Sequence, residues 1–401
     1  MRGSTEPTGD RWFGVGSSTG PRAGQAGADA ARAAQAGRRA NLVVVFCSTL
    51  YDAAELLEGV CSVTPDDAVV VGSTSMGELV SDKHDWAAGP QPSVVVAALG
   101  GPGFAVRSTF VPRASADHRQ AGIEAASVMD QVNAPNKVML MILDGLLRER
   151  HKLVRGAYSV LGASVPIVGG CAADNLTYTL TQQFYGTGQA VDVLSDSVVA
   201  VGLGSSGPLG VGLGHGWHKH GQPMVVTGSN EGEVFLIDNQ PALDVYLRCI
   251  GADKSLAEDA YKFREVAFNH PLGLSRGDGE DLRVIHSANP ERGSVSCLAD
   301  VPQGALVWTM RTNERSLIEA AVSSCQMALD GLGGAEPVGL LIFDCGARVV
   351  RLGRGNVSAE QGAIRSAVGA PFAGFYTYGE IARTRGSRGT HHLTVASLAL
   401  A

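Results

Sequence analysis

The sequence lacks several features that mark whole classes of protein. It has no block of basic residues, and 32 Lys and Arg against 39 Asp and Glu give a net charge of −7, so no nucleic-acid partner is expected. No apolar run reaches the length of a membrane span. Residues 1–10 contain no apolar core, so the start of the chain does not resemble a secretion signal.

Cysteine is sparse and irregularly placed. The chain has 7 cysteines, an odd number, and none of them forms a C-x-x-C pair. This pattern predicts reduced thiols in a cytoplasmic protein, without a disulfide framework or a zinc knuckle. No Gly-Lys-Ser or Gly-Lys-Thr occurs, which excludes a P-loop nucleotide site.

Glycine and apolar residues, by contrast, are abundant. The 401 residues are 45% hydrophobic and 18% charged, which indicates a globular chain long enough for two domains. The 52 glycines show no collagen-like period. They are typical of a fold with many strand ends and turns.

Three stretches share a short apolar run that ends in glycine and then in small or polar residues. We call residues 69–79, 165–175 and 371–381 the first, second and third glycine segments. The first and third carry a Gly-Glu pair five residues after their first glycine, ending in Glu78 and Glu380. This detail suggests one structural unit used three times.

The residues around the glycine segments repeat in the same order. Apolar runs predict buried strands, and periodic apolar residues between them predict helices. We therefore expect an α/β (α+β) fold of repeated strand-helix-strand-helix-strand units, with sheets covered by helices. The expected central strands are residues 42–46, 137–143 and 338–343; the expected helices are 51–60, 114–132, 146–161, 314–332 and 358–368; strand 305–310 is expected to open the third round.

The sequence also suggests a division into two domains. Residues 1–11 read as a flexible start. A stretch rich in Gly, Ser and Asn over residues 228–232 lies between two apolar runs, which is typical of a boundary. We expect one domain over residues 12–230 and a second over residues 231–401.

Many short motifs, in the same order, make the chain resemble the FIST sensory domain family, in both its N-terminal and C-terminal domains. The resemblance covers roughly residues 12–400. Its motifs are WFGVGSS at 12–18, GSTSMGE at 72–78, GGCAADN at 169–175, HGW at 215–217, DNQPALDVY at 238–246, HPLG at 270–273, FDC at 343–345 with Arg348, and AGFYTYGEI at 373–381.

The resemblance implies a cytoplasmic sensor of small molecules such as amino acids. Members of the family are attached to or encoded near kinases, methyl-accepting proteins or cyclic-dinucleotide enzymes, and some bacterial members are reported to bind haem and sense nitric oxide. No attached output domain is recognisable here. We therefore expect the signal to leave through a separate partner protein.

Polar groups at the glycine segments are the candidate ligand-binding residues. Glu78 and Glu380 could pair with a ligand ammonium group, and Asp174 and Asn175 could accept hydrogen bonds from a ligand. The alternative is that these side chains cap helices or bind loop N–H groups. Arg348 could bind a ligand carboxylate or form an ion pair with Asp344; the ion pair is favoured.

Histidines and cysteines support the alternative functions. His215 and His270 are candidate axial ligands if the protein binds haem, although an exposed polar turn or local backbone bonding explains them equally simply. Cys171 and Cys345 could act in a thiol-dependent enzyme, or serve only as packing. The function we expect is a non-catalytic small-molecule sensor. The alternatives are a haem-binding nitric oxide sensor, a thiol-dependent enzyme and a protein-interaction scaffold.

Overall fold

The computed structural model describes residues 10–82, 91–276, 279–383 and 389–401, so the expected flexible start lies almost entirely outside the described residues. The α/β class is confirmed, with 29% helix, 40% strand and several mixed sheets. The chain divides into two compact units. Unit 1 comprises Met1–Gly214, Ile318–Thr390 and Thr394–Ala401; unit 2 comprises His215–Leu317 and His391–Leu393.

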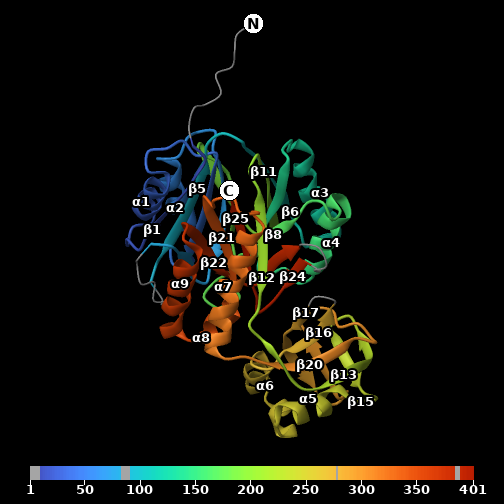
Figure 1. Cartoon of the computed structure of the whole chain (residues 1–401). Helices are drawn as coiled ribbons and strands as arrows, with labels where there is room; N and C mark the ends of the chain where they lie inside the picture. The colour runs from blue at the N-terminus through green and yellow to red at the C-terminus, as the bar shows by residue number, and fades with distance from the viewer. Residues whose placement is uncertain (1–9, 83–90, 277–278, 384–388) are drawn as a thin grey trace. The chain divides into compact units, whose positions relative to one another are not determined.

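Unit 1 contains three copies of one motif, as the repeats predicted. In each copy two parallel strands joined by a helical crossover lie beside two antiparallel strands (Figure 1). The corresponding strands are ordered β1-β5-β2-β3, β6-β11-β7-β8 and β12-β25-β21-β22 in three separate sheets.

The elements of the first copy are β1 (Trp12–Ser18), α1 (Ala23–Gln35), β2 (Leu42–Ser48), α2 (Ala53–Cys61), β3 (Val69–Ser75) and β5 (Val94–Gly100). Those of the second are β6 (Phe104–Pro112), α3 (His118–Ala126), β7 (Asn136–Leu143), α4 (Arg150–Leu161), β8 (Ile167–Cys171) and β11 (Ser197–Ser205). Those of the third are β12 (Leu209–Gly214), α7 (Glu314–Asp330), β21 (Gly339–Cys345), α8 (Gly346–Leu352), α9 (Arg354–Val368), β22 (Phe372–Thr377) and β25 (Val395–Leu400).

Each copy also gives one or two strands to the sheet of another copy. The first copy sends β4 (Glu78–Val80) to pair with β22, and the third sends β23 (Glu380–Arg383) to pair with β8, with β24 (Gly389–His391) beside β23. The second sends β9 (Gln183–Thr187) to pair with β3, followed by β10 (Ala190–Leu194). The exchange therefore forms a closed ring, which sequence periodicity did not predict.

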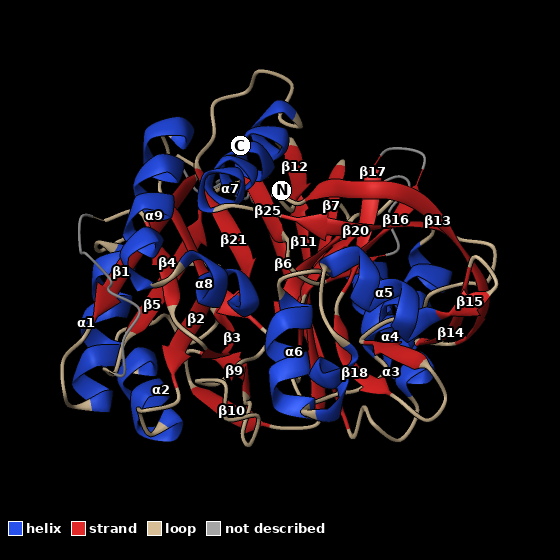
Figure 2. Ribbon diagram, turned by 90° about the horizontal axis from the view of Figure 1, so that it is seen from below, coloured by secondary structure: helices blue, strands red, loops and turns tan. Residues whose placement is uncertain are grey.

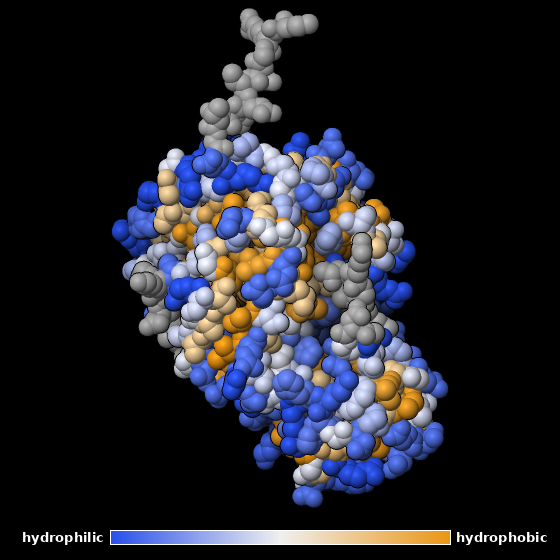
Figure 3. Space-filling view, viewed as in Figure 1, coloured by the Kyte–Doolittle hydropathy of each residue, from blue (hydrophilic) through white to orange (hydrophobic). Residues whose placement is uncertain are grey.

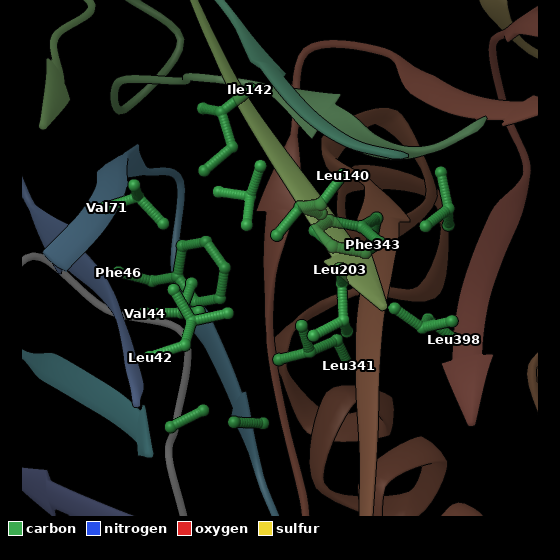
Figure 4. Packing of buried hydrophobic residues seen from close by; sticks show 14 of the residues in the cluster. Leu42, Val44, Phe46, Val71, Leu140, Ile142, Leu203, Leu341, Phe343 and Leu398 are labelled. Carbon is green, nitrogen blue, oxygen red and sulfur yellow. The ribbon is translucent and has the colours of Figure 1, made fainter. Parts of the chain in front are cut away.

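The inner faces of the three sheets share one apolar core. Phe46, Ile142 and Phe343 occupy the equivalent position on β2, β7 and β21 and belong to the same buried cluster (Figure 4). Phe46 stacks on Phe375 with ring centroids 4.3 Å apart. Since burying a large apolar side chain contributes about 1.5–3 kcal/mol, this shared cluster stabilises the three copies together.

Helices cover the outer faces, as expected for continuous apolar strands. The pair α1–α2 packs on the first sheet, and α7 and α9 pack on the third (Figure 2). The pair α3–α4 packs on the second sheet (Figure 1). Helix α3 begins at His118, later than expected, because the Asp117 side chain caps it by accepting a hydrogen bond from the Gln120 N–H. Helix α4 begins at Arg150 instead of residue 146, and the short helix α8 was not anticipated.

The same steric constraint explains the first glycine of each glycine segment. A Cβ atom on Gly72, Gly169 or Gly374 would lie 1.9, 1.9 or 2.0 Å from a carbonyl oxygen of the neighbouring parallel strand. No larger residue fits so close to backbone, so glycine is required at all three positions.

Unit 2 is inserted into the third copy, between β12 and α7. The strand expected to open the third round is β20 (Leu306–Arg311), which belongs to unit 2; the true first strand, β12, lies upstream of the insertion. That prediction was wrong because an insertion separates sequence neighbours that a repeat would keep together. The compact units accordingly differ from the linear division expected at residues 228–232.

Unit 2 has its own sheet and apolar core. Its strands are ordered β17-β16-β20-β13-β14-β19-β18, with β15 beside β14. Their bounds are β13 (His218–Asn230), β14 (Glu233–Ile237), β15 (Gln240–Pro241), β16 (Leu272–Arg276), β17 (Gly279–Arg283), β18 (Ile285–Asn289) and β19 (Ser294–Cys297); the helices are α5 (Ala242–Ile250) and α6 (Ala260–Phe268).

The surface carries a mixture of hydrophilic and hydrophobic side chains on the face that Figure 3 shows. Among the described residues no helix combines the length and apolar character needed to cross a membrane.

Candidate functional site

The strand exchange brings three polar side chains to equivalent positions in unit 1. Glu78, Gln183 and Glu380 each lie on a strand received from another copy, directly opposite the residue that follows the first glycine of a glycine segment. Across each sheet this gives a row of four paired residues on the inner face. The rows are Val95, Phe46, Ser73 and Gln183; Val199, Ile142, Gly170 and Glu380; and Ala396, Phe343, Phe375 and Glu78.

Glu78 is buried, and both of its carboxyl oxygens accept hydrogen bonds. Its Oε1 accepts a hydrogen bond from Ser75 Oγ at 2.5 Å, and its Oε2 accepts one from Ser93 Oγ at 2.6 Å. Burial raises the pKa of Glu78 to about 7, and the hydrogen bonds from the two serines oppose that rise. Through the two serine hydrogen bonds, the Glu78 carboxyl group links β4 to the first sheet.

Glu380 repeats this arrangement in the third copy. Its Oε1 accepts from Thr377 Oγ1 at 2.8 Å, and its Oε2 from the hydroxyl and backbone N–H of Thr394 at 2.7 and 3.2 Å. Burial likewise raises the pKa of Glu380 to about 7. Thr377 and Thr394 occupy the positions of Ser75 and Ser93, so the two glutamates are bound in the same way.

Gln183 holds this position in the second copy, but without partners. It is fully buried, and neither its amide oxygen nor its amide nitrogen has a hydrogen-bond partner among the described residues. The equivalent of Ser75 is Ala172, and the equivalent of Ser93, Ser197, donates to the Ser195 carbonyl at 2.8 Å. Ser73, opposite Gln183, is also buried, and its hydroxyl has no partner in the part of the chain that the structure describes.

Spacing alone does not locate this position in the second copy. Asp174 and Asn175 align with the Gly-Glu pairs by spacing, but the structure places Gln182 and Gln183 there. The Thr74 N–H donates to the Gln182 carbonyl at 3.0 Å, just as the Tyr376 N–H donates to the Gly77 carbonyl at 2.8 Å. Residues 174–181 are therefore an insertion, and a glutamine beyond it gave no sequence signal.

Asp174 anchors this insertion. Its carboxylate accepts hydrogen bonds from the Tyr378 hydroxyl, the Thr177 hydroxyl and four backbone N–H groups, those of residues 177–180. Burial alone would raise the pKa of Asp174, but these bonds outweigh it and lower the pKa to about 2. Tyr178 stacks on Tyr378 at 4.7 Å. A ligand role for Asp174, or for the exposed Asn175, stays a prediction.

Arg348 forms the expected ion pair with Asp344. Its Nε donates to Asp344 Oδ1 at 2.7 Å, and one terminal nitrogen bonds Glu360 Oε1 at 2.6 Å, with all three side chains fully buried. Burial raises the pKa of Asp344 well above its ordinary value, against the attraction of Arg348. Glu360, on α9, was not anticipated because its helical spacing is ordinary. Binding of a ligand carboxylate by Arg348 stays a prediction.

The two candidate haem ligands lie in unit 2 and bond local backbone. His215 Nδ1 accepts from the Trp217 N–H at 2.9 Å, and His270 Nδ1 lies 3.0 Å from the Val266 carbonyl oxygen. In His270, the contact through Nδ1 leaves Nε2 as the nitrogen that could face an iron. Haem ligation by either residue stays a prediction.

The candidate thiols are buried. Burial raises the pKa of Cys171, although the nearby Arg150 cation opposes the rise. Since the thiolate is the nucleophile, this environment disfavours reaction at Cys171. Cys345 is also buried, at the end of β21.

Two family models match the chain. That of the FIST N domain matches residues 41–240, and that of the FIST C domain matches residues 242–383. The junction between the matches lies inside unit 2, so it follows the linear sequence and not the compact units.

The chain is also similar to curated proteins over nearly its whole length. The uncharacterized protein Rv0628c of Mycobacterium tuberculosis (strain ATCC 25618 / H37Rv) is 26% identical over 399 residues, covering 97% of this chain and 99% of its own. The uncharacterized protein MT0656 of strain CDC 1551 / Oshkosh matches to the same extent. A cyanuric acid hydrolase from A. caulinodans covers 97% of this chain at 12% identity, but its TM-score of 0.30 is too low to support a conclusion about fold or activity.

Proposed function

Because this chain belongs to the FIST domain family, a family of sensory domains, we propose that it is a non-catalytic, intracellular sensor of a small molecule such as an amino acid. We place the ligand on the inner face of unit 1, where the exchanged strands carry Glu78, Gln183 and Glu380. The output is proposed to pass to a separate signalling protein, such as a kinase or a cyclic-dinucleotide enzyme.

One observation carries the location of the site. Glu78 and Glu380 are bonded by matched hydroxyl groups, whereas Gln183 and Ser73 are buried with no partner among the described residues. An unpaired buried polar group costs about 1–3 kcal/mol, so a ligand that pairs with it would be favoured. The site also lies at the carboxyl ends of parallel strands, where α/β folds bind ligands.

The same geometry supports a sensor in preference to an enzyme. Both glutamates are occupied by neutral donors, and burial disfavours the thiolate of Cys171. A ligand at Gln183 and Ser73 would contact strands of the first and second copies, which pair at this point. Binding could therefore shift how the copies pack, by no more than the difference in the ligand's affinity for the two arrangements.

The test is a thermal-shift screen of the full chain against amino acids and their simple derivatives. A ligand that binds only the folded state stabilises it by about 2.7 kcal/mol at a hundred times its Kd, so a saturable rise in Tm is expected. Recovery of the ligand chemically unchanged is expected for a sensor. Absence of any saturable rise, or conversion of the ligand, would contradict the proposal.

A double variant tests the location. Glu78→Gln with Glu380→Gln should weaken binding of a ligand found in the screen, because both side chains occupy positions equivalent to that of Gln183 on the inner face. Glu58→Gln, an exposed change on α2, is the matched control. Unchanged affinity in the double variant would remove both glutamates from the site.

A further inference from the structure

We infer that the ligand presents a neutral amide group to Gln183 and Ser73, and that this amide is the feature by which the site selects it. The inference rests on the proposed function and names the chemistry of its ligand. It starts from a difference between the three copies at this buried position. Two copies complete the position with hydroxyl donors, whereas the Gln183 amide of the second copy and the facing Ser73 hydroxyl of the first copy are unpaired among the described residues.

The two unpaired groups lie side by side. Ser73 and Gln183 are register partners on antiparallel strands, so their side chains point to the same face. Phe46 is the register partner of Ser73 on its other side and belongs to the shared core, which shows that this face is the inner one. Both polar side chains therefore point toward the interior between the sheets, beside the shared apolar core.

The available bonds define the complementary group. The Gln183 amide offers an acceptor oxygen beside two N–H donors, and the Ser73 hydroxyl offers one more donor or acceptor. A carboxamide pairs with an amide through two parallel N–H···O bonds. An ammonium group would leave the Gln183 N–H groups unpaired, and a carboxylate would leave its oxygen unpaired.

The buried acids of the other two copies also favour a neutral ligand group. The equivalent positions carry the carboxyl groups Glu78 and Glu380, both buried. A ligand carboxylate at Gln183 would add a further negative charge to a buried layer that already holds two acids, and burying an uncompensated charge is unfavourable. A neutral amide avoids this cost and pairs with both the oxygen and an N–H of Gln183.

The insertion, residues 174–181, leads directly to the proposed site. Residue 181 is the last of the insertion and lies only two positions before Gln183. At the tip of the insertion, Tyr178 is 56% exposed and Leu180 is 50% exposed. The Tyr378 hydroxyl fixes the insertion in place by hydrogen bonding to the carbonyl and the carboxylate of Asp174. Release of that contact would move the segment that leads directly into Gln183.

The experiment compares ligands that differ only in amide against carboxylate. The full chain is titrated with glutamine and glutamate, asparagine and aspartate, and propanamide and propanoate, with Tm and calorimetry as readouts. The amide of at least one pair should bind tenfold or more tightly than its acid, roughly the effect of losing one or two buried hydrogen bonds. Tighter binding of the acids would overturn the inference but would agree with the proposed sensor function.

Variants separate recognition from structure. Gln183→Leu, with Gln183→Met as a second variant, should keep or raise the Tm of the unliganded protein, because it removes an unpaired amide, and should abolish the response to the amides. Gln120→Leu, at an exposed position on α3, is the control. A lowered Tm with an intact amide response would mean that internal water pairs the Gln183 amide, which would overturn the inference. If neither these probes nor the wider screen raises the Tm of the unaltered protein, the proposed function fails as well.

Discussion

Replacing Glu78 by glutamine should change how stability depends on pH. The ordinary pKa of this carboxyl is 4.5, and burial raises it to about 7 in the folded protein. A raised folded-state pKa means that its contribution to stability is fully present below 4.5 and is lost as the pH rises through about 7. A glutamine at this position does not titrate, so the variant should lose this dependence.

The magnitude follows from the two pKa values. Between about pH 8.5 and about pH 5.5 the folded state takes up nearly one proton at Glu78 that the unfolded chain mostly does not bind, which is worth about 2 kcal/mol. As the pH falls from about 8.5 to about 5.5, the free energy of unfolding of the unaltered protein should therefore rise by about 2 kcal/mol more than that of Glu78→Gln. One of Ser75 and Ser93 can rotate to accept from the new amide N–H while the other still donates to the amide oxygen, so the variant should fold.

The assay is urea denaturation at both pH values, with exposed Glu58→Gln as the control. Glu380→Gln should give a change of the same sign, because its carboxyl is held in the same way. If the difference between Glu78→Gln and the unaltered protein is the same at both pH values, as for the control, the reasoning that burial raises this pKa is refuted.

Three further changes test the fold. Arg348→Met should cost about 3–5 kcal/mol in urea denaturation, because Asp344 and Glu360 would lose their buried partner; a loss under 1 kcal/mol, roughly the value of a surface pair, would contradict this. Gly374→Ala should destabilise by about 3 kcal/mol, whereas Gly362→Ala, with open space around its Cβ on α9, should stabilise by up to about 1 kcal/mol; equal melting temperatures would refute the steric argument. Tyr378→Phe should cost about 2 kcal/mol and speed proteolysis within residues 174–181, and an unchanged cleavage rate would mean that the hydroxyl does not hold the insertion.

Local patterns in the sequence predicted the repeated units well. Continuous apolar runs marked β2, β7 and β21, and the glycines at 72, 169 and 374 marked the strand beside each. These features are local, since a strand buried on both faces and a glycine facing a carbonyl each leave a trace within a few residues.

The rest depends on contacts between distant residues. The pairing of β4 with β22 joins positions nearly 300 residues apart, and no local pattern specifies such a partner. The insertions of unit 2 and of residues 174–181 broke the spacing on which the repeat argument relied. Gln183 was missed for that reason, and Glu360 because a helical glutamate looks the same whether it meets solvent or a buried arginine.

The ring of exchanged strands sets the order in which the chain can finish folding. During synthesis the third sheet can receive β4 only after β22 has emerged, and the second sheet must wait for β23, near the C-terminal end. Until then two sheets have an open edge, and exposed edges invite pairing with other chains. A nascent or truncated chain that ends before residue 372 should therefore be prone to aggregation, and the complete unit 1 should unfold in a single cooperative step because no copy keeps all its strands alone.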